Sequence, residues 1–425
     1  MSLSYASGIR PLREQKKLER GFWNAAVPST CIVPLQQHVG SKLAPLVQQG
    51  DVVREGMIIA DGPGRFAVPL HAPIPGRVST VGTTRLFDNT TSLAIMIELA
   101  GEFDRLGKEP ERLDWSTRNP DELREMVRRG GVVATGRAPL PLHSYLRRGQ
   151  GGVPPLLVLD LAETEPYLTA DTELTSTYPD AVLEGLRIIA RILSTTETRV
   201  LYSPGNRSAL TALRRGMDRT VRIHRVPHRY PANLEQRIRR VVLPTRERDD
   251  PARRVITVRP STAHAVYEAV VLGKPQIEQV IAVGGGAVAR PAHIRIRLGT
   301  SVADVISECG GLLANPARLV AGGPLTGSEV FNVHAPLPKH VTAVLALTES
   351  EIGTAPEHPC IRCGACVRAC PVGINPVLIH DLVAAGRAGE ARRAGRSDCV
   401  ECGLCSHVCP SRIPLVERIR EVDGE

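Results

Sequence analysis

Long apolar runs are missing from this chain of 425 residues. No uninterrupted apolar stretch approaches the roughly 20 residues that a membrane-spanning helix needs. The longest candidate, residues 154–162, contains Asp160. Residues 1–20 are charged and have no apolar centre, which argues against a secretory signal. The sequence therefore predicts a cytoplasmic protein that has no transmembrane segment of its own.

Aromatic side chains are also scarce, at 3% of the residues. Proteins that bind single-stranded nucleic acid stack its bases on aromatic rings, and such platforms are few here. No nucleic-acid motif is visible either. We therefore expect no nucleic-acid partner.

Lysine is absent from residues 199–259, where 16 arginines and five acidic residues give a local charge of +11. The formal charge of the whole chain is +9, so this stretch accounts for the entire excess. Two interpretations stay open. The stretch is either a solvated arginine-rich surface or a docking face for an acidic protein or a phosphate-bearing ligand.

Cysteine is rare outside one segment, because eight of the ten cysteines lie between Cys360 and Cys409. A secreted disulfide framework would spread its cysteines through the fold. Their clustering instead indicates metal ligation in a reducing compartment. The two remaining cysteines, Cys31 and Cys309, are expected to be buried small apolar residues.

The eight clustered cysteines form the same motif twice: Cys360-x2-Cys363-x2-Cys366-x3-Cys370-Pro371 and Cys399-x2-Cys402-x2-Cys405-x3-Cys409-Pro410. This spacing is typical of bacterial ferredoxins with two [4Fe–4S] clusters, in which the fourth cysteine of each run ligates the other cluster. The predicted ligands are Cys360, Cys363, Cys366 and Cys409 for cluster 1, and Cys399, Cys402, Cys405 and Cys370 for cluster 2. The alternative, structural zinc, pairs two cysteines from each of two knuckles and needs no such repeated run.

The pattern of apolar runs and turns divides the chain into five parts. Residues 1–28 are expected to form an irregular arm, and residues 29–100 to form short strands resembling the barrel of lipoyl carrier domains. Carrier domains attach their cofactor to a lysine on one hairpin, and no lysine lies between Lys42 and Lys108 here, so we interpret the module as structural. Residues 115–250 alternate helices and strands, which predicts an α/β domain. Residues 251–345 are expected to form a small α+β module, and residues 346–425 the two-cluster domain.

Individual elements are predicted from periodicity and capping residues. Helices are expected at 120–129, after the capping residue Asn119, at 180–193, at 302–308 and at 376–385, after Asn375. Strands are expected at 32–35, 57–60, 66–70, 76–78, 156–159, 199–202, 279–283, 294–298 and 343–345.

The whole chain resembles a known family, the RnfC subunit of ion-translocating electron-transport complexes. The resemblance rests on the cysteine motifs and on five further segments. These are Ser7-Gly8-Ile9-Arg10-Pro11, the run from Val33 to Gly40, the run from Glu163 to Asp171, Arg290-Pro291 with Arg297-Leu298-Gly299-Thr300, and Gly322-Gly323-Pro324-Leu325-Thr326-Gly327. It implies a barrel-sandwich hybrid, a flavoprotein-subunit-like α/β domain, an SLBB-like β-grasp module and a bacterial-type two-[4Fe–4S] ferredoxin domain. It also implies electron exchange with ferredoxin or NADH, and membrane subunits as partners.

The resemblance further implies an FMN and NADH site at Gly136, Arg137, Glu163 and Glu165. The flavin loop of the family is rich in glycines, which let backbone N–H groups approach the cofactor. Here Arg137 and Pro139 replace two of those glycines, and Asn233 and Leu234 replace two more in a second loop. Two readings follow: the flavin pocket has been lost, or Arg137 pairs with the flavin phosphate.

The status of the flavin decides the expected mechanism. NADH delivers two electrons as a hydride, whereas a cluster accepts one, and a flavin usually converts between them. Without FMN the chain is a one-electron relay, and oxidation of NADH by this subunit alone is not expected. Arg237, Arg239 and Arg240 are then the residues through which we expect an acidic ferredoxin to dock. The alternatives are a cobalamin-reductase-type flavoprotein of a microcompartment and a docking subunit whose clusters are structural.

Overall fold

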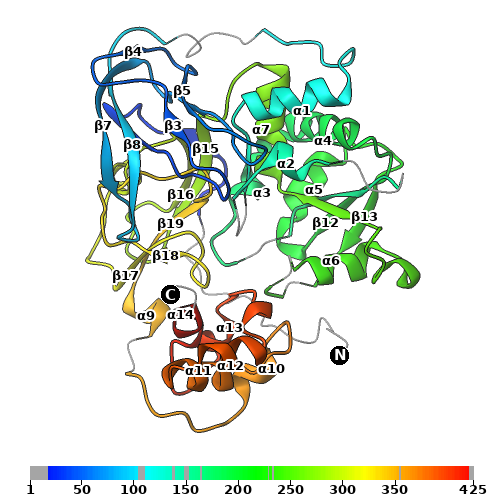
Figure 1. Cartoon of the computed structure of the whole chain (residues 1–425), viewed down its shortest axis with the longest axis vertical. Helices are drawn as coiled ribbons and strands as arrows, with labels where there is room; N and C mark the ends of the chain where they lie inside the picture. Colours follow the sequence, from blue (N-terminus) through cyan, green and yellow to red (C-terminus); the bar gives the residue numbers. More distant parts are fainter. Residues whose placement is uncertain are drawn as a thin grey trace.

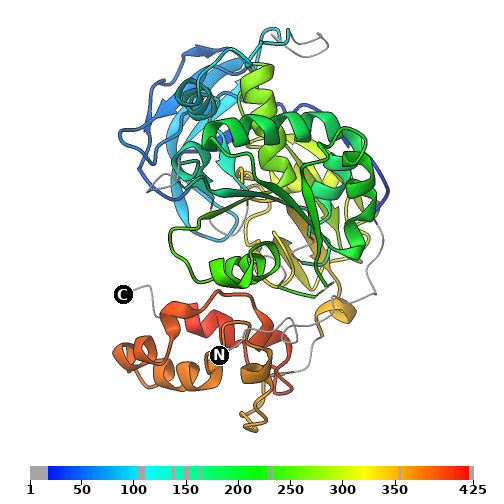
Figure 2. The same cartoon turned by 90° about the vertical axis from the view of Figure 1, so that its right-hand side faces the viewer.

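Four groups of elements follow one another along the chain, and the colours of Figure 1 trace them from blue to red. The structure, a computed structural model, describes residues 18–103, 111–135, 139–147, 153–162, 165–227, 229–231, 234–353 and 356–420. The first three groups pack side by side. The fourth holds both cysteine motifs and forms a separate lobe below them, which Figure 2 shows in orange and red.

The first module consists of two small antiparallel sheets that share one apolar core. Gly76 begins its longest strand, and a Cβ there would lie 1.9 Å from the carbonyl oxygen of Glu98, so only glycine fits this register. The strands are β2 (Thr30–Pro34), β3 (Ala44–Pro45), β4 (Val52–Val53), β5 (Ile58–Asp61), β6 (Leu70–His71), β7 (Gly76–Arg85) and β8 (Thr91–Leu99).

The strands predicted at 32–35, 57–60 and 76–78 are confirmed in position by β2, β5 and β7. The strand predicted at 66–70 is wrong except at Leu70, where β6 begins. Pro69 explains part of this difference, because proline has no N–H to donate to a neighbouring strand. Cys31 is fully buried in the core of this module, as predicted.

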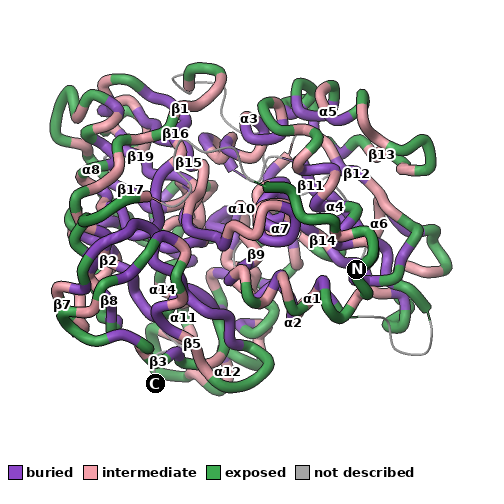
Figure 3. Tube along the Cα trace, turned by 90° about the horizontal axis from the view of Figure 1, so that it is seen from above, coloured by how far each residue is buried: buried purple, intermediate pink, exposed green. Residues whose placement is uncertain are grey.

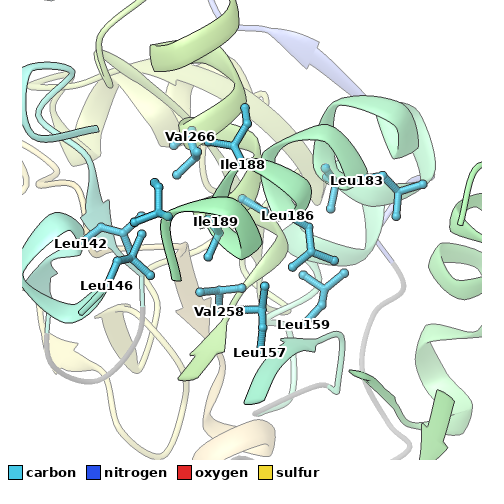
Figure 4. Close-up of a cluster of buried hydrophobic side chains, with 14 of the residues drawn as sticks. Leu142, Leu146, Leu157, Leu159, Leu183, Leu186, Ile188, Ile189, Val258 and Val266 are labelled. Atoms are coloured by element: carbon cyan, nitrogen blue, oxygen red, sulfur yellow. The ribbon is translucent and has the colours of Figure 1, made fainter. Parts of the chain in front are cut away.

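The second module is a parallel sheet of four strands, in the order β13-β12-β11-β14, covered by helices. Its central strand β11 is buried along its whole length, as expected for a parallel sheet covered on both faces. Figure 4 shows the core in which Leu157, Leu159 and Val258 of the sheet meet Leu186 and Ile189 of the covering helix α4. The elements are α1 (Pro120–Arg129), β9 (Val133–Ala134), β10 (Leu140–Pro141), α2 (Leu142–Tyr145), β11 (Leu156–Asp160), α3 (Ala170–Thr177), α4 (Pro179–Leu193), β12 (Thr198–Tyr202), η2 (Pro204–Asn206), α5 (Arg207–Leu213), β13 (Arg222–Arg225), α6 (Glu235–Val242), η3 (Thr245–Glu247), β14 (Val255–Val258) and α7 (Pro260–Val271).

Helix α1 begins as predicted. The side chain of Asn119 accepts hydrogen bonds from the backbone N–H groups of Asp121 and Glu122, and the Glu122 carboxylate accepts one from the Asn119 N–H. This reciprocal pairing satisfies donors that the first helical turn leaves free. The predicted helix at 180–193 and the predicted strands at 156–159 and 199–202 are confirmed by α4, β11 and β12.

The α/β module extends past residue 250, where the sequence placed its end. Strand β14 pairs with β11 in the four-stranded sheet, and α7 packs against α4. Gly185 of α4 allows this close contact, because a Cβ there would lie 1.9 Å from the carbonyl oxygen of Ala263. The chain therefore leaves this module after Val271. The other predicted boundaries stay predictions.

The third module is a six-stranded mixed sheet in the order β1-β16-β15-β19-β17-β18, with one helix. Its edge strand β1 comes from the predicted N-terminal arm, so Phe22–Asn24 is a strand that pairs with β16 and not an irregular segment. Residues 1–17 of that arm lie outside the described residues. Cys309 is buried in this core, as predicted. The elements are β1 (Phe22–Asn24), β15 (Glu278–Gly284), β16 (Ala292–Arg297), α8 (Val302–Glu308), β17 (Arg318–Ala321), β18 (Ser328–Glu329) and β19 (Ala343–Leu347).

The fourth module is a small helical lobe that carries the cysteine motifs. Asn375 accepts a hydrogen bond from the Leu378 N–H at 3.2 Å and caps α11, which confirms the helix predicted after it. The elements are α9 (Glu349–Ile352), α10 (Ala365–Ala369), α11 (Pro376–Ala384), α12 (Ala388–Arg393), η4 (Arg396–Asp398), α13 (Leu404–His407) and α14 (Leu415–Arg420). Buried segments gather inside the modules, and exposed ones follow the periphery (Figure 3). Within the described ranges, no helix is both long enough and apolar enough to cross a bilayer.

Lys339 is a buried cation where the first three modules meet. Its Nζ donates to the carbonyl oxygen of Gly131 at 2.7 Å, and its backbone N–H donates to Oε1 of Gln37 at 3.2 Å. Burial lowers the pKa of Lys339 to about 7. Burial also lowers the pKa of His71, to about 3, and the nearby charge of Lys339 contributes to that shift. The junction of the modules is therefore sensitive to the charge of one lysine.

We expect Lys339→Met to remove a pH-dependent part of the stability. The pKa of this lysine is about 7 in the folded chain, against the ordinary value of 10.5. Between these values folding releases a proton, so the native chain gains about 1.4 kcal/mol per pH unit as the pH rises. The melting temperature of the native chain should therefore rise between pH 7 and pH 9 relative to that of the variant. Parallel pH profiles of the two proteins would contradict the burial of this ammonium group.

Candidate metal centre and the adjoining pocket

The two cysteine motifs adopt the same local backbone conformation. Arg362 and Glu401 occupy the same place in each motif and have positive φ angles of 55° and 49°. Each motif then has a glycine with positive φ that begins a short helix, Gly364 before α10 and Gly403 before α13. The sequence repeat is therefore also a structural repeat.

In each motif, a backbone N–H points at the sulfur of the first cysteine. The N–H of Arg362 donates to Sγ of Cys360, and the N–H of Glu401 donates to Sγ of Cys399, both at 3.4 Å. Such hydrogen bonds stabilise negative charge on sulfur and tune the potential of a bound cluster.

Four cysteines line one pocket inside the lobe. They are Cys370 from the first motif and Cys399, Cys402 and Cys405 from the second. The other residues that line this pocket are largely apolar and include Ile374, Val400, Leu404, Val416 and Ile419. The structure thus brings together the four residues predicted as ligands of cluster 2, including the one contributed by the other motif.

The environment of these thiols suits metal-bound thiolates and opposes free ones. Burial, together with the neighbouring Cys402, Cys399 and Cys370, raises the pKa of Cys405 to about 12. Burial also raises the pKa of Cys399. Several thiolates can share this apolar site only when a cation compensates their charge, as iron does. The donor set and its surroundings therefore fit an iron–sulfur cluster.

The remaining four cysteines do not line this pocket. Cys366 is buried and packs with Cys409 in an apolar cluster that also contains Cys405 of the second motif. Burial raises the pKa of the Cys366 thiol, and the nearby Cys409 raises it further. Cys360 and Cys363 are exposed. The structure therefore joins Cys409 to the first motif, and leaves two of its predicted partners accessible from solvent.

The second motif is covered by the body of the protein. The hydroxyl of Tyr230 donates to the carbonyl oxygen of Cys402 at 2.7 Å, and both residues are buried. Leu325 packs against them, and a Cβ on Gly403 would lie 2.5 Å from its carbonyl oxygen. The pocket for cluster 2 is therefore closed on the side of the body, whereas the first motif faces outward.

A second pocket lies next to this contact and is lined by residues of all four modules, including Phe87 of the first. It begins at the carboxyl edge of the parallel sheet, where α/β proteins bind their ligands. Glu165 is one of its walls, and its carboxylate accepts hydrogen bonds from the N–H groups of Leu325 and Thr326, at 2.8 and 3.1 Å, and from the Thr326 hydroxyl. The lining includes Thr135, Glu165, Asp171, Tyr230, Arg259, Gly322, Gly323, Thr326, His340, Glu401 and Arg420.

Arg259 is the central cation of this pocket, and two carboxylates already pair with it. It contacts Asp160 at 3.4 Å and Asp171 at 2.8 Å. Burial raises the pKa of Asp160, and the positive charge of Arg259 opposes that shift. Arg420, at the rim, pairs with Glu401 at 3.1 Å. Within the described residues, no arginine or lysine of this pocket is free of a carboxylate partner.

The structure describes only one of the four residues predicted to bind FMN and NADH. Glu165 lies in the pocket just described, but its carboxylate is engaged by the loop at 322–327. Gly136, Arg137 and Glu163 lie outside the described residues. In the described part of the pocket, Arg259 and Arg420 already pair with carboxylates. The FMN and NADH site therefore stays a prediction, and we derive no electron-transfer step through a flavin.

Tyr230 and the Asp160–Arg259 pair are features that the sequence did not assign. A charge inside the apolar run at 154–162 was the available signal for a buried ion pair, because an isolated buried charge is too costly. The interpretation of residues 229–235 as an altered flavin loop left Tyr230 without a role. In the structure this tyrosine connects the body to the second cysteine motif.

Comparison with known proteins agrees with this division into modules. Residues 3–102 match the RnfC barrel sandwich hybrid domain, and residues 127–258 match the Nuo51 FMN-binding domain. Residues 280–328 match the SLBB domain, and residues 359–413 match the 4Fe-4S dicluster domain. The last match and the eight clustered cysteines assign two [4Fe–4S] clusters to the chain.

Curated relatives are similar along nearly the whole chain. The C component of the ion-translocating oxidoreductase complex of Rhodobacter capsulatus is 35% identical and covers 100% of this chain and 83% of its own length. The C component of the proton-translocating ferredoxin:NAD(+) oxidoreductase complex of Clostridium ljungdahlii is 30% identical, covering 90% and 85%. Among solved structures, an NAD+-reducing [NiFe]-hydrogenase in the H2-reduced state has a TM-score of 0.50 at 16% identity, over 72% of this chain and 61% of its own, which shows a likeness of fold alone.

Proposed function

Because this chain belongs to the RnfC family of ion-translocating oxidoreductase complexes, we propose that it is the electron-transfer subunit of such a complex. It lies peripherally on the cytoplasmic side of the membrane and contacts the membrane subunits of the complex. The matches do not favour a cobalamin-reductase-type flavoprotein or a docking subunit with structural clusters. The observation that carries the proposal is the pocket lined by four cysteines from both motifs.

The ligand sets are part of this proposal. Cys370, Cys399, Cys402 and Cys405 hold cluster 2, which the pocket they share supports. Cys360, Cys363, Cys366 and Cys409 hold cluster 1, which the packing of Cys409 against Cys366 supports. The bound clusters supply one-electron chemistry. The protein contributes thiolates, N–H groups directed at sulfur, and an apolar enclosure that excludes water from the inner site.

The two cluster sites differ in their exposure to solvent, and this difference determines which partner each site can contact. Tyr230 and Leu325 cover the inner site, so it exchanges electrons with whatever lies at the body of the protein. The outer site has exposed Cys360 and Cys363, so it meets a partner at the surface. The exposed side chain of Ile361, at 68%, lies between them in sequence. The lobe therefore connects the body to an external carrier.

We assign that external carrier as an acidic, soluble ferredoxin. Arg362 and Arg368 flank the exposed cysteines, both are exposed, and residues 359–379 contain no acidic residue. The second motif has Glu401 at the position that corresponds to Arg362, and there it pairs with Arg396 and Arg420. Positive charge is thus present at the outer site and neutralised at the inner one. Complementary charge speeds the encounter of redox partners.

Reversal of both charges, in Arg362→Glu with Arg368→Glu, should slow electron exchange with an acidic ferredoxin roughly tenfold at low salt. The salt dependence of the rate should flatten, because steering by charge would be lost. Stopped-flow absorbance of the clusters measures both effects. The matched control is Arg392→Glu with Arg393→Glu, an equal charge change on exposed residues of α12 in the same lobe. Equal slowing in both variants would refute the assignment of the docking face.

A further inference from the structure

A pocket lies at the amino-terminal edge of the parallel sheet, opposite the edge that faces the cysteine lobe. Strands β12 and β13, on the right of Figure 1, supply one wall, and the end of α6 supplies the other. The polar groups of the lining are Arg199, Arg222, His224, Arg253, Glu197 and Glu247. This pocket contains part of the arginine-rich stretch, and the proposed electron relay does not use it.

Three other arginines of that stretch have structural roles in the fold. Arg237 is fully buried and donates to the carbonyl oxygen of Pro231 at 2.7 Å. Arg239 donates to the carbonyl oxygens of Arg248 and Arg253. Arg259 forms the buried pairs described above. The stretch is therefore not a uniform docking face, and the interpretation of Arg237 as a docking residue is wrong.

The strand register places like charges side by side in the pocket. Arg199 of β12 and Arg222 of β13 are direct partners in adjacent parallel strands, so their side chains lie on the same face of the sheet. His224 follows two residues after Arg222 and lies on that face as well. Like charges placed opposite each other destabilise a sheet. A bound anion between them would remove this repulsion.

The carboxylates of the pocket do not satisfy these cations. Glu197 accepts from Arg253 at 2.8 Å and from Arg199 at 3.3 Å, and Glu247 accepts from Arg253 at 3.2 Å. The Nε of Arg199 and the Nε2 of His224 are buried and have no hydrogen-bond partner. Among the described residues, no carboxylate pairs with Arg222. Donors and positive charge therefore remain for a ligand.

The pKa shifts of the groups in this pocket agree with an excess of positive charge. Burial lowers the pKa of the Arg199 guanidinium, and the neighbouring Arg222 lowers it further. Burial also lowers the pKa of His224, with contributions from Arg199 and Arg222. The charge of Glu197 opposes the shift at Arg199 but does not cancel it. Burial of such groups is costly unless something compensates their charge.

We propose that this pocket binds a phosphate-type oxyanion between Arg199, Arg222 and His224. Guanidinium groups hold phosphate oxygens through paired, charge-assisted hydrogen bonds, and the free Nε of Arg199 and Nε2 of His224 are donors for the remaining oxygens. The anion is either free phosphate or the phosphate group of a larger ligand such as a nucleotide. The site is independent of the clusters and of the electron-transfer role.

Inorganic phosphate, added to the full-length protein with its clusters, is the probe. Calorimetry at constant ionic strength should show saturable binding to one site. Arg222→Gln should weaken that binding roughly tenfold or more, because one charge-assisted contact is lost. Arg222 is exposed, so this variant should fold. The control is Arg225→Gln, on the same strand, exposed and on the opposite face, and it should bind phosphate as the native chain does.

Competition with AMP and ADP distinguishes the two sources of phosphate. Tighter binding of a nucleotide, lost in Arg222→Gln, identifies the anion as part of a larger ligand, and preference for the free ion identifies phosphate itself. Binding that is absent, or equal in Arg222→Gln and the native chain, would overturn the proposal. Binding of a polyglutamate peptide that depends on Arg222, without binding of phosphate, would overturn it in favour of an acidic protein partner.

Discussion

Cys370→Ser should remove cluster 2, although Cys370 belongs to the first motif. The iron content should fall from about eight to about four atoms per chain, since each cluster holds four. The reason is that Cys370 lines the same pocket as Cys399, Cys402 and Cys405. Loss of one thiolate from a closed set of four leaves an iron without its ligand. Iron and sulfide analysis, together with the absorbance of the anaerobic protein, measures the loss.

The spectra of matched variants decide which cluster is lost. Cys370→Ser should resemble Cys399→Ser, and Cys409→Ser should resemble Cys360→Ser, when the reduced proteins are compared by electron paramagnetic resonance. Cys309→Ala is the control, because this buried thiol lies in the core of the third module, apart from the lobe. If Cys370→Ser instead resembles Cys360→Ser, each motif ligates its own cluster and the crossed arrangement is wrong.

Arg237→Glu should destabilise the α/β module by about 3–5 kcal/mol, the usual cost of disrupting a buried charge. Arg237 is 0% exposed, and its guanidinium donates to the carbonyl oxygen of Pro231. A carboxylate at this position would face that oxygen without a proton to share. The melting temperature should fall by roughly 10 °C, measured by circular dichroism under anaerobic conditions.

The matched control is Arg246→Glu, in the same arginine-rich stretch. The side chain of Arg246 is 85% exposed, and its pairing with the adjacent Glu247 at 3.5 Å is a surface contact. Substitutions of this kind usually change stability by less than about 0.5 kcal/mol. Similar melting temperatures for Arg237→Glu and the native chain would show that Arg237 is accessible to solvent, contrary to the structure.

Local signals in the sequence predicted much of the fold. The cap at Asn119, the proline at 120 and the apolar spacing of 180–193 are short-range features, and the helices that they predict are present. The cysteine spacing predicted ligand sets, and the structure brings Cys370 to the second motif. Both kinds of signal depend on neighbours in the chain or on a motif with fixed chemistry.

Contacts between distant segments were not predictable in the same way. Pairing of Phe22–Asn24 with β16 spans most of the chain, and nothing local at these residues indicates a strand partner. We interpreted the arginine-rich stretch as a single surface, because composition does not distinguish the buried Arg237 from the exposed Arg246. The contact of Tyr230 with the lobe and the position of Lys339 between three modules depend on how the modules pack. These features needed the three-dimensional arrangement.

The central claim is that the eight cysteines hold two clusters that carry electrons one at a time. An anaerobic reductive titration of the full-length protein, followed by absorbance and electron paramagnetic resonance, tests it most directly. We expect uptake of about two electrons per chain, one for each cluster, in one-electron steps. Uptake of a single electron, or a two-electron step accompanied by FMN released on denaturation, would contradict it.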